Sequence, residues 1–244
     1  MVPLPFRQQM LPQVVGRSQG YFPLVGLLLG ATLLGLDRLL GLALPSFVVN
    51  TLLVIALLLL TGALHIDGFA DTCDGLGGRR SPQERREIMH DSRVGGFGVA
   101  GVCCLLILKV VSLAGVPEGS RMAALLLMPV MGRWAIVYAV FAYPYARAHG
   151  LGKIFKETAG WRSLIMATLI TLVIAICFAE IGGLVILVAV WIIVVVIASY
   201  LRRKFGGLTG DTYGAINEVA EVAVLLVISI FATHGPWLMS CLPW

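Results

Sequence analysis

The sequence predicts an all-α, polytopic helical membrane protein with about seven transmembrane helices and a cytoplasmic N-terminus. Of its 244 residues, 59% are hydrophobic and 13% are charged, and its mean hydropathy of +0.93 is far above that of soluble domains. A helix needs about 20 apolar residues to cross about 30 Å of hydrocarbon. Segments of this kind cover residues 22–45, 47–66, 96–116, 121–142, 163–180, 182–201 and 216–234. No repeat or linker divides them, so residues 1–244 are interpreted as a single integral membrane domain.

The first of these segments, residues 22–45, is the least regular. Asp37 and Arg38 interrupt its apolar run. Charged side chains inside a membrane segment are costly unless they pair or face a polar cavity. We therefore expect this segment to be broken, to be re-entrant, or to pair its charges inward.

The orientation follows from the basic residues, because Lys and Arg gather in short cytoplasmic loops. Most of the 18 Lys and Arg residues precede the first segment or fall in the 67–95, 143–162 and 202–215 loops. This alternation predicts that these loops and the N-terminus are cytoplasmic and that the C-terminus is outside. The bias also accounts for the net charge of +5 without a nucleic-acid partner, and it leaves anionic lipid and phosphorylated substrates as candidate partners.

An acidic stripe follows the second apolar segment, in the stretch "TGALHIDGFADTCDGLGG". Asp67, Asp71 and Asp74 are spaced i, i+4 and i+7, so a helix would place them on one face. Three carboxylates on one face repel each other, and a divalent cation would neutralise them. Oxygen ligands of this kind suit Mg²⁺ or Mn²⁺, which often bridge to substrate phosphates. The alternative is a solvated, acid-capped helix end without a metal.

The loop after the stripe carries further polar candidates in "GLGGRRSPQERREIMHDSRVGGFG". Arg79 and Arg93 lie near the acids and are flanked by glycines. Guanidinium is a planar, bidentate donor to phosphate, so both are candidate phosphate ligands. His90 and Asp91 close the same loop, where a functional and a structural role for the histidine are equally well supported. The other arginines of the loop are interpreted as topology markers.

A second polar cluster lies in "KFGGLTGDTYGAINEVAEVAVLL" and contains Asp211, Glu218 and Glu221. Carboxylates at the start of a membrane helix favour a metal or a basic partner over lipid. The alternation of basic loops places this cluster on the same membrane face as the aspartate stripe. Arg133 lies deep in its segment, so we expect it to face a substrate, a polar cavity or an acid. Lys109 is expected to snorkel toward the outer surface.

The motifs "HIDGFADTCDGLGG", "IMHDSRVGGFG", "GRWAIVY" and "GGLTGDTYGAINEVAE" together resemble the cobalamin synthase family, whose activity is adenosylcobinamide-GDP ribazoletransferase. The resemblance covers nearly the whole chain and departs from the family in a shorter N-terminus. It implies an Mg²⁺-dependent enzyme, with Mn²⁺ as an alternative metal. Its reaction joins adenosylcobinamide-GDP to α-ribazole or its 5′-phosphate and releases GMP, the last assembly step of vitamin B12. It also implies a multi-pass protein of the bacterial inner membrane with its active site on the cytoplasmic face.

Roles can be assigned to the polar residues on this basis. In such a phosphoryl transfer, metal ions held by acids neutralise the diphosphate, and a positioned base accepts the proton of the attacking ribose hydroxyl. The candidate metal ligands are Asp67, Asp71, Asp74 and Asp211; the candidate catalytic residues are Asp74, His65 and Glu221; the candidate substrate-binding residues are Arg79, His90, Asp91, Arg93, Arg133 and Glu218.

Two other classes of membrane protein also use acidic clusters. A CDP-alcohol phosphotransferase or a prenyltransferase would share the aspartates and Mg²⁺, but the chain reads "DTCDGLGGRR" where the CDP-alcohol pattern has different spacing. An ion-coupled transporter is less favoured, because transporters commonly show inverted repeats or helices broken near the midplane. Membrane lipid is an expected partner in every case, and a homo-oligomer stays open.

Overall fold

The described residues of the computed structural model, 18–91, 93–147 and 151–234, are helical and contain no β-strand. In chain order the elements are η1 (Gln19–Tyr21), α2 (Phe22–Leu40), α3 (Ser46–Leu60), α4 (Leu64–Leu76), α5 (Pro82–Ile88), α6 (Gly96–Ala114), α7 (Glu118–Ala142), α8 (Leu151–Thr158), α9 (Trp161–Phe205) and α10 (Gly210–His234). Five of these units, α2 with η1, α6, α7, α9 and α10, are long and apolar enough to cross a membrane. The bent pair α3 and α4 would add a sixth, so the predicted all-α, polytopic membrane fold is confirmed.

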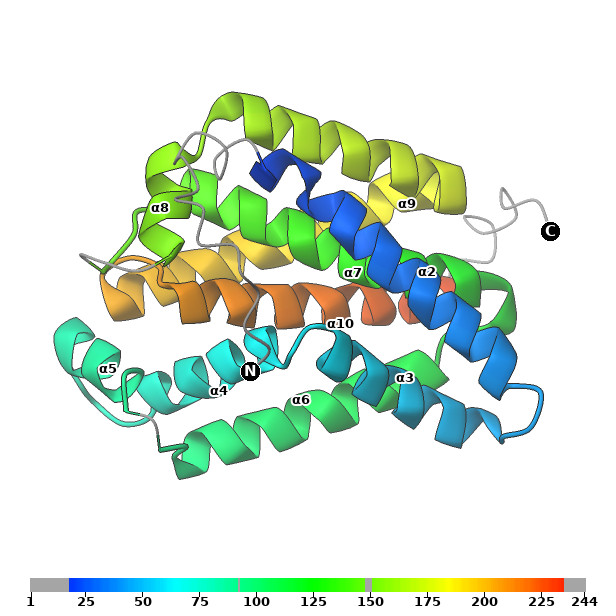
Figure 1. The fold of residues 1–244 in the computed structure, drawn as a ribbon, viewed down its shortest axis with the longest axis horizontal. Helices are drawn as coiled ribbons and strands as arrows, with labels where there is room; N and C mark the ends of the chain where they lie inside the picture. Colours follow the sequence, from blue (N-terminus) through cyan, green and yellow to red (C-terminus); the bar gives the residue numbers. More distant parts are fainter. Residues whose placement is uncertain (1–17, 92, 148–150, 235–244) are drawn as a thin grey trace, which may run out of the picture.

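Helix α9 is a hairpin rather than one long rod. Glu180 has φ 43° and ψ −133°, which is far from helical geometry. A Cβ on Gly183 would lie 2.2 Å from the carbonyl oxygen of Ala175, so the chain has folded back on itself. Figure 1 shows the first arm along the top of the view and the second arm returning in the opposite direction behind α7. The two arms correspond to the apolar segments predicted over 163–180 and 182–201.

The predicted segment 47–66 is wrong as a single straight span. Helix α3 ends at Leu60, and α4 leaves it at an angle of 91°. The turn is made by Gly62 with φ 60° and Ala63 with φ 57°, in the left-handed region that favours glycine. Hydropathy measures how apolar a stretch is and does not sense such a break. The bend directs the aspartate-bearing helix α4 along α6 and α10 instead of straight on from α3.

The first segment is neither broken nor re-entrant: α2 is continuous, although it ends at Leu40 rather than at residue 45. Asp37 is 7% exposed and accepts a 2.6 Å hydrogen bond from Arg121 Nη2 of α7. The same nitrogen donates to Asn50 Oδ1 of α3 at 2.6 Å. The expectation of inward pairing is confirmed, and Arg121 is itself buried. This cluster joins α2, α3 and α7.

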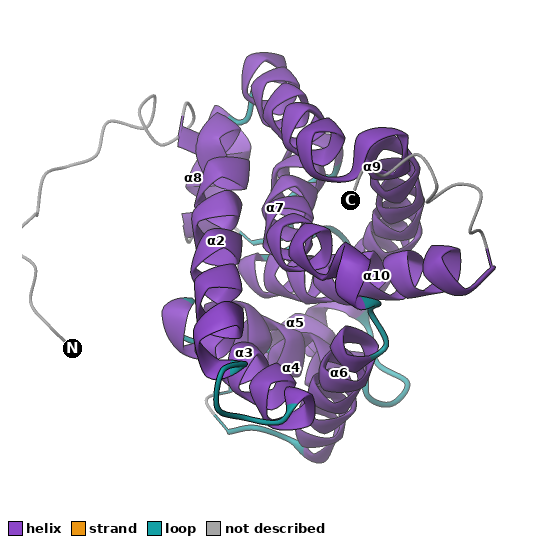
Figure 2. Ribbon diagram, turned by 90° about the vertical axis from the view of Figure 1, so that its right-hand side faces the viewer, coloured by secondary structure: helices purple, strands orange, loops and turns teal. Residues whose placement is uncertain are grey.

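Helix α7 forms the centre of the bundle. It contacts α2, α9 and α10, and Figure 2 shows it between them. Most residues of α7 and α10 are buried, whereas α2, α6 and α9 expose many of their apolar side chains. Such exposed apolar faces suit lipid contact. The polar residues of α7 and α10 therefore have to find partners inside the protein.

The connections between helices gather at two ends of the molecule (Figure 1). The α4–α6 connection with α5, the α8 region and the α9–α10 turn lie at the left end. The α2–α3 loop, the α6–α7 turn and the reversal of α9 lie at the right end. The three loops predicted to be cytoplasmic therefore share one end, which we call the polar end. Residues 1–17 and 235–244, with the predicted locations of the two termini, lie outside the described residues.

The orientation in the membrane can be tested with single cysteines placed in a Cys-free background. Gln83, Glu157 and Glu118 are exposed, the first two at the polar end and the third at the opposite end. We expect a membrane-impermeant thiol reagent to label positions 83 and 157 from the cytoplasmic side only, and position 118 from the outside only. Labelling of positions 83 and 118 from the same side would contradict the orientation given by the basic loops.

Candidate functional site

The two polar clusters of the sequence meet where α4 crosses α10. A Cβ on Gly68 of α4 would lie 2.7 Å from the backbone oxygen of Asp211 and 2.9 Å from its Cα. A Cβ on Gly214 of α10 would lie 2.9 Å from the backbone oxygen of His65. Side chains at either position would push the helices apart, so the glycines permit backbone contact. This crossing places the first turn of α10 directly beside the aspartate stripe.

Three carboxylates lie at this crossing, and we call Asp67, Asp71 and Asp211 the acid cluster. The half-buried carboxyl of Asp71 interacts electrostatically with Asp211 and Asp67, and also with Arg147. Asp67 is exposed, and Asp211 is partly buried. The structure thus brings Asp211 next to two members of the stripe, although it is far away in sequence.

Asp74, the third member of the stripe, has a different environment. Its Oδ2 accepts a 2.7 Å hydrogen bond from the Gly95 amide, and its Oδ1 accepts one of 2.7 Å from the Gly98 amide. These amides belong to the N-terminus of α6, where unsatisfied N–H groups favour a carboxylate. Asp74, predicted as a general base and metal ligand, therefore has both carboxylate oxygens engaged by backbone amides. Its carboxylate is a helix cap that fixes α6 against α4.

The sequence missed Arg147, which lies between α7 and α8. Its Nη2 donates a 2.6 Å hydrogen bond to Asp211 Oδ2. The two side chains are 18% and 21% exposed, so the pair is only partly open to solvent. It is one of four basic residues in the 143–162 loop, and no local motif distinguishes it. Its contact with the acid cluster arises only in the folded chain.

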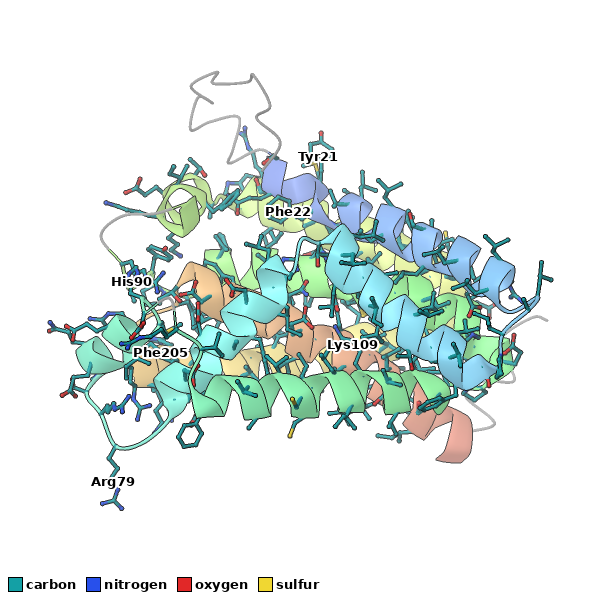
Figure 3. All side chains as sticks on the ribbon, turned by 60° about the horizontal axis from the view of Figure 1, so that its bottom comes forward. Tyr21, Phe22, Arg79, His90, Lys109 and Phe205 are labelled. Atoms are coloured by element: carbon teal, nitrogen blue, oxygen red, sulfur yellow. The ribbon has the colours of Figure 1, made fainter. Side chains whose placement is uncertain are left out.

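The residues of the loop after α4 are spread over the polar end. Arg79 is exposed, and Figure 3 shows it extending away from the protein. Arg93 pairs with Asp91 through Nη2 and Oδ2 at 2.8 Å, with its own side chain 87% exposed. Hydrogen bonds from Arg93 lower the pKa of Asp91 to about 2. His90 is exposed and interacts electrostatically with Asp211.

A pocket of about 470 Å³ opens beside the end of α4 and the start of α6. Its lining includes Asp74, Gly78, Arg80, Asp91, Arg93 and Phe97. It therefore combines two guanidinium groups with an aromatic ring. Arg85, by contrast, is buried and donates to the carbonyls of Gly75 and Gly78 at 2.7 and 2.9 Å. That arginine holds α5 against the end of α4 and is more than a topology marker.

A buried ion network lies deeper in the bundle and consists of Lys109, Arg133, Glu218 and Glu221. Lys109 Nζ donates to Glu218 Oε2 and to Glu221 Oε2, both at 2.6 Å. Arg133 Nη1 donates to Glu221 Oε1. All four side chains are 5% exposed or less. Two positive and two negative charges from α6, α7 and α10 therefore balance each other.

This network corrects two expectations from the sequence. Lys109 does not snorkel outward, because its ammonium group is inside the bundle between α6 and α10 (Figure 3). Glu218 is engaged by Lys109 instead of being free to bind substrate. Of the two roles expected for Arg133, the structure shows the ion pair, with Glu221.

His65 lies on the α4 side of this network. Its ring interacts electrostatically with Arg133, Glu221 and Lys109. Its Nδ1 is buried and has no hydrogen-bond partner among the described residues. The two remaining catalytic candidates, His65 and Glu221, are therefore close to each other. Both are largely buried, whereas Asp67 is exposed.

No three His, Cys, Asp or Glu side chains in the described parts of the chain are arranged to hold one metal ion. Mg²⁺ usually takes one or two protein carboxylates and completes its shell with water and substrate phosphate. The acid cluster suits that mode, because Asp71 interacts electrostatically with both Asp67 and Asp211, and Arg147 supplies one positive charge to the three carboxylates. The donor chemistry therefore fits a divalent cation that is shared with a phosphorylated ligand.

Comparison with known proteins shows the family to which the chain belongs. Residues 1–229 match the family described as cobalamin-5-phosphate synthase. Three relatives named adenosylcobinamide-GDP ribazoletransferase come from Roseiflexus sp. (strain RS-1), Geotalea daltonii and Syntrophobacter fumaroxidans. They are 37%, 37% and 40% identical and cover 95%, 93% and 91% of this chain and 86%, 92% and 91% of their own lengths. No solved structure matches. The chain belongs to the cobalamin-5-phosphate synthase family.

Proposed function

We propose that the protein joins adenosylcobinamide-GDP to α-ribazole or its 5′-phosphate and releases GMP. The observation that carries this proposal is the similarity, over at least 91% of the chain, to relatives named for that reaction. A ribose hydroxyl of the acceptor attacks the phosphorus on the cobinamide side of the diphosphate. A new phosphodiester forms, the bond to the bridging oxygen breaks, and GMP leaves with that oxygen. The hydroxyl proton passes to a base.

The acid cluster is the place where this chemistry is best supported. One or two of the carboxylates of Asp67, Asp71 and Asp211 would hold Mg²⁺ or Mn²⁺, and the ion would neutralise charge on the diphosphate and on the departing GMP. A carboxylate oxygen left off the ion accepts the proton of the attacking hydroxyl. Asp67 is the exposed member of the cluster, so it is open to an acceptor arriving from the polar end.

The surroundings of the cluster support binding of a long, anionic substrate. The pocket with Arg80 and Arg93 lies beyond Asp74, and its guanidinium groups suit phosphate oxygens. His90 of the same loop interacts electrostatically with Asp211. We assign the active site to the cytoplasmic face of a bacterial inner membrane, because the polar end carries the basic loops. Exposed apolar side chains on α2, α6 and α9 would contact the lipid.

The test is product analysis with the full-length protein in detergent micelles. Adenosylcobinamide-GDP, Mg²⁺ and either α-ribazole or its 5′-phosphate are expected to give GMP and the joined cobamide. Omitting the acceptor should abolish GMP formation, which separates transfer from hydrolysis. A folded preparation that releases no GMP with either acceptor would overturn the proposal. Formation of CMP from a CDP-alcohol would support the competing phosphotransferase class.

Asp211 and Asp67 are expected to act on one metal site. Asp211→Asn should weaken the apparent Mg²⁺ affinity, measured from the metal dependence of GMP release. Its effect should be non-additive with that of Asp67→Asn, because residues that share a site do not contribute independently. Rate losses that multiply cleanly, with unchanged Mg²⁺ dependence in Asp211→Asn, would show that α10 contributes no metal ligand.

A further inference from the structure

The chain segment that carries Arg147 is attached to the start of α10. The Ala146 amide donates to Leu208 O and the Leu208 amide donates to Pro144 O, both at 2.8 Å, in a short parallel bridge. Tyr145 stacks on Tyr213 of α10 with 6.3 Å between ring centroids. These contacts fix the backbone next to Arg147. They therefore hold its side chain beside the acid cluster.

The guanidinium of Arg147 has a buried N–H donor without a hydrogen-bond partner among the described residues. Nη2 bonds to Asp211, whereas Nε is buried and has no partner among the described residues. Arg85 offers a comparison, because its Nε, Nη1 and Nη2 each donate to a backbone carbonyl. A buried arginine with a purely structural role normally satisfies its donors in this way. Arg147 therefore keeps donor capacity for a group outside the described residues.

The charges around Arg147 indicate what that group is. Arg147 acts electrostatically on both Asp71 and Asp211. A divalent cation on the same carboxylates would compete with the guanidinium for Asp211 and repel it. Displaced from Asp211, a guanidinium on an anchored segment needs another anion, and a diphosphate bridged to the same cation supplies one.

We propose that Arg147 is a substrate ligand that contacts the diphosphate of adenosylcobinamide-GDP. Without a divalent cation on the acid cluster, the Arg147 guanidinium is paired with Asp211 instead. This inference rests on the proposed function. A substrate-binding role and a structural role for the Arg147–Asp211 pair predict different effects of removing Arg147. Removing Arg147 should help metal binding and harm substrate binding, whereas loss of structural support would harm both.

The experiment compares Arg147→Gln and Arg147→Lys with the wild-type protein and with Arg203→Gln. Arg203 is an exposed arginine near the end of α9, so its variant controls for loss of one positive charge at the polar end. Mn²⁺ binding without substrate is measured by electron paramagnetic resonance. We expect Arg147→Gln to bind Mn²⁺ several-fold more tightly and Arg147→Lys to bind it about as tightly as wild type, because lysine keeps the charge.

The second measurement is the KM for each substrate at saturating Mg²⁺. Both Arg147 variants should raise the KM for adenosylcobinamide-GDP by about tenfold or more, the size of a lost charge-assisted contact, and leave the KM for α-ribazole unchanged. Weaker Mn²⁺ binding in Arg147→Gln, or an unchanged KM for adenosylcobinamide-GDP in both variants, overturns the inference. If the wild-type protein itself releases no GMP, the proposed function fails together with this inference.

Discussion

Replacing Asp71 with Asn is expected to slow GMP release by at least about 10²-fold while the protein stays folded in the membrane. Asp71 is the half-buried member of the acid cluster and interacts with Asp67, Asp211 and Arg147. Asn keeps the size of the side chain and removes the charge that a divalent cation needs. The loss should therefore appear in turnover and in Mn²⁺ affinity, and thermal unfolding should change little.

The matched control for this variant is Glu157→Gln. Glu157 is an acid on α8 at the same end, 63% exposed and paired with Lys153 in the adjacent turn. An exposed pair of this kind contributes little to stability, so its loss should leave activity near wild type. Near-normal turnover in Asp71→Asn would remove Asp71 from the metal site. An equal loss in Glu157→Gln would show that the assay responds to net charge rather than to the acid cluster.

The fold could be predicted largely because the bilayer limits the choices. Long apolar runs between basic loops give spanning helices and an alternation of ends, and both predictions describe α2, α6, α7 and α10 correctly. The break at Gly62 and Ala63 could not be predicted this way, because it lies within a continuous apolar run. The consequence reaches the site, since the bend sets the direction of α4 and its aspartates.

The sequence shows which polar residues are candidates for the site, but it does not show which residues each of them contacts in the fold. Spacing placed Asp67, Asp71 and Asp74 on one face, but it could not show that Asp74 caps α6. That contact depends on how α4 and α6 pack. Arg147 had no local signal, because its role comes from the bridge between its segment and residue 208.

The buried ion network had a usable signal in the sequence. Lys109 and Arg133 are cations inside apolar segments, and Glu218 and Glu221 are acids inside another. Equal numbers of opposite charges at membrane depth favour mutual pairing over separate routes to the surface. Lys109 by itself suggests snorkelling. The four charges together predict the buried pairing that the structure shows.

The largest effect on stability is expected from Lys109→Met. Lys109 Nζ binds Glu218 and Glu221 at 2.6 Å, and its side chain is 1% exposed. Methionine fills a similar volume but leaves two buried carboxylates with Arg133 as their counter-ion. Breaking a buried pair by removing one partner costs about 3–5 kcal/mol, because the remaining charge is uncompensated. Unfolding by sodium dodecyl sulfate in mixed micelles measures this loss.

The double variant Lys109→Met with Glu218→Gln separates the charge from the packing. It removes one cation and one anion, so Arg133 and Glu221 remain as a balanced pair. We expect it to recover most of the stability that Lys109→Met loses, giving a coupling of about 2 kcal/mol or more between the two substitutions. Glu218→Gln alone should destabilise less than Lys109→Met, because Lys109 keeps Glu221. A double variant as unstable as Lys109→Met would show that the packing of the lysine stem, and not charge balance, holds α6 against α10.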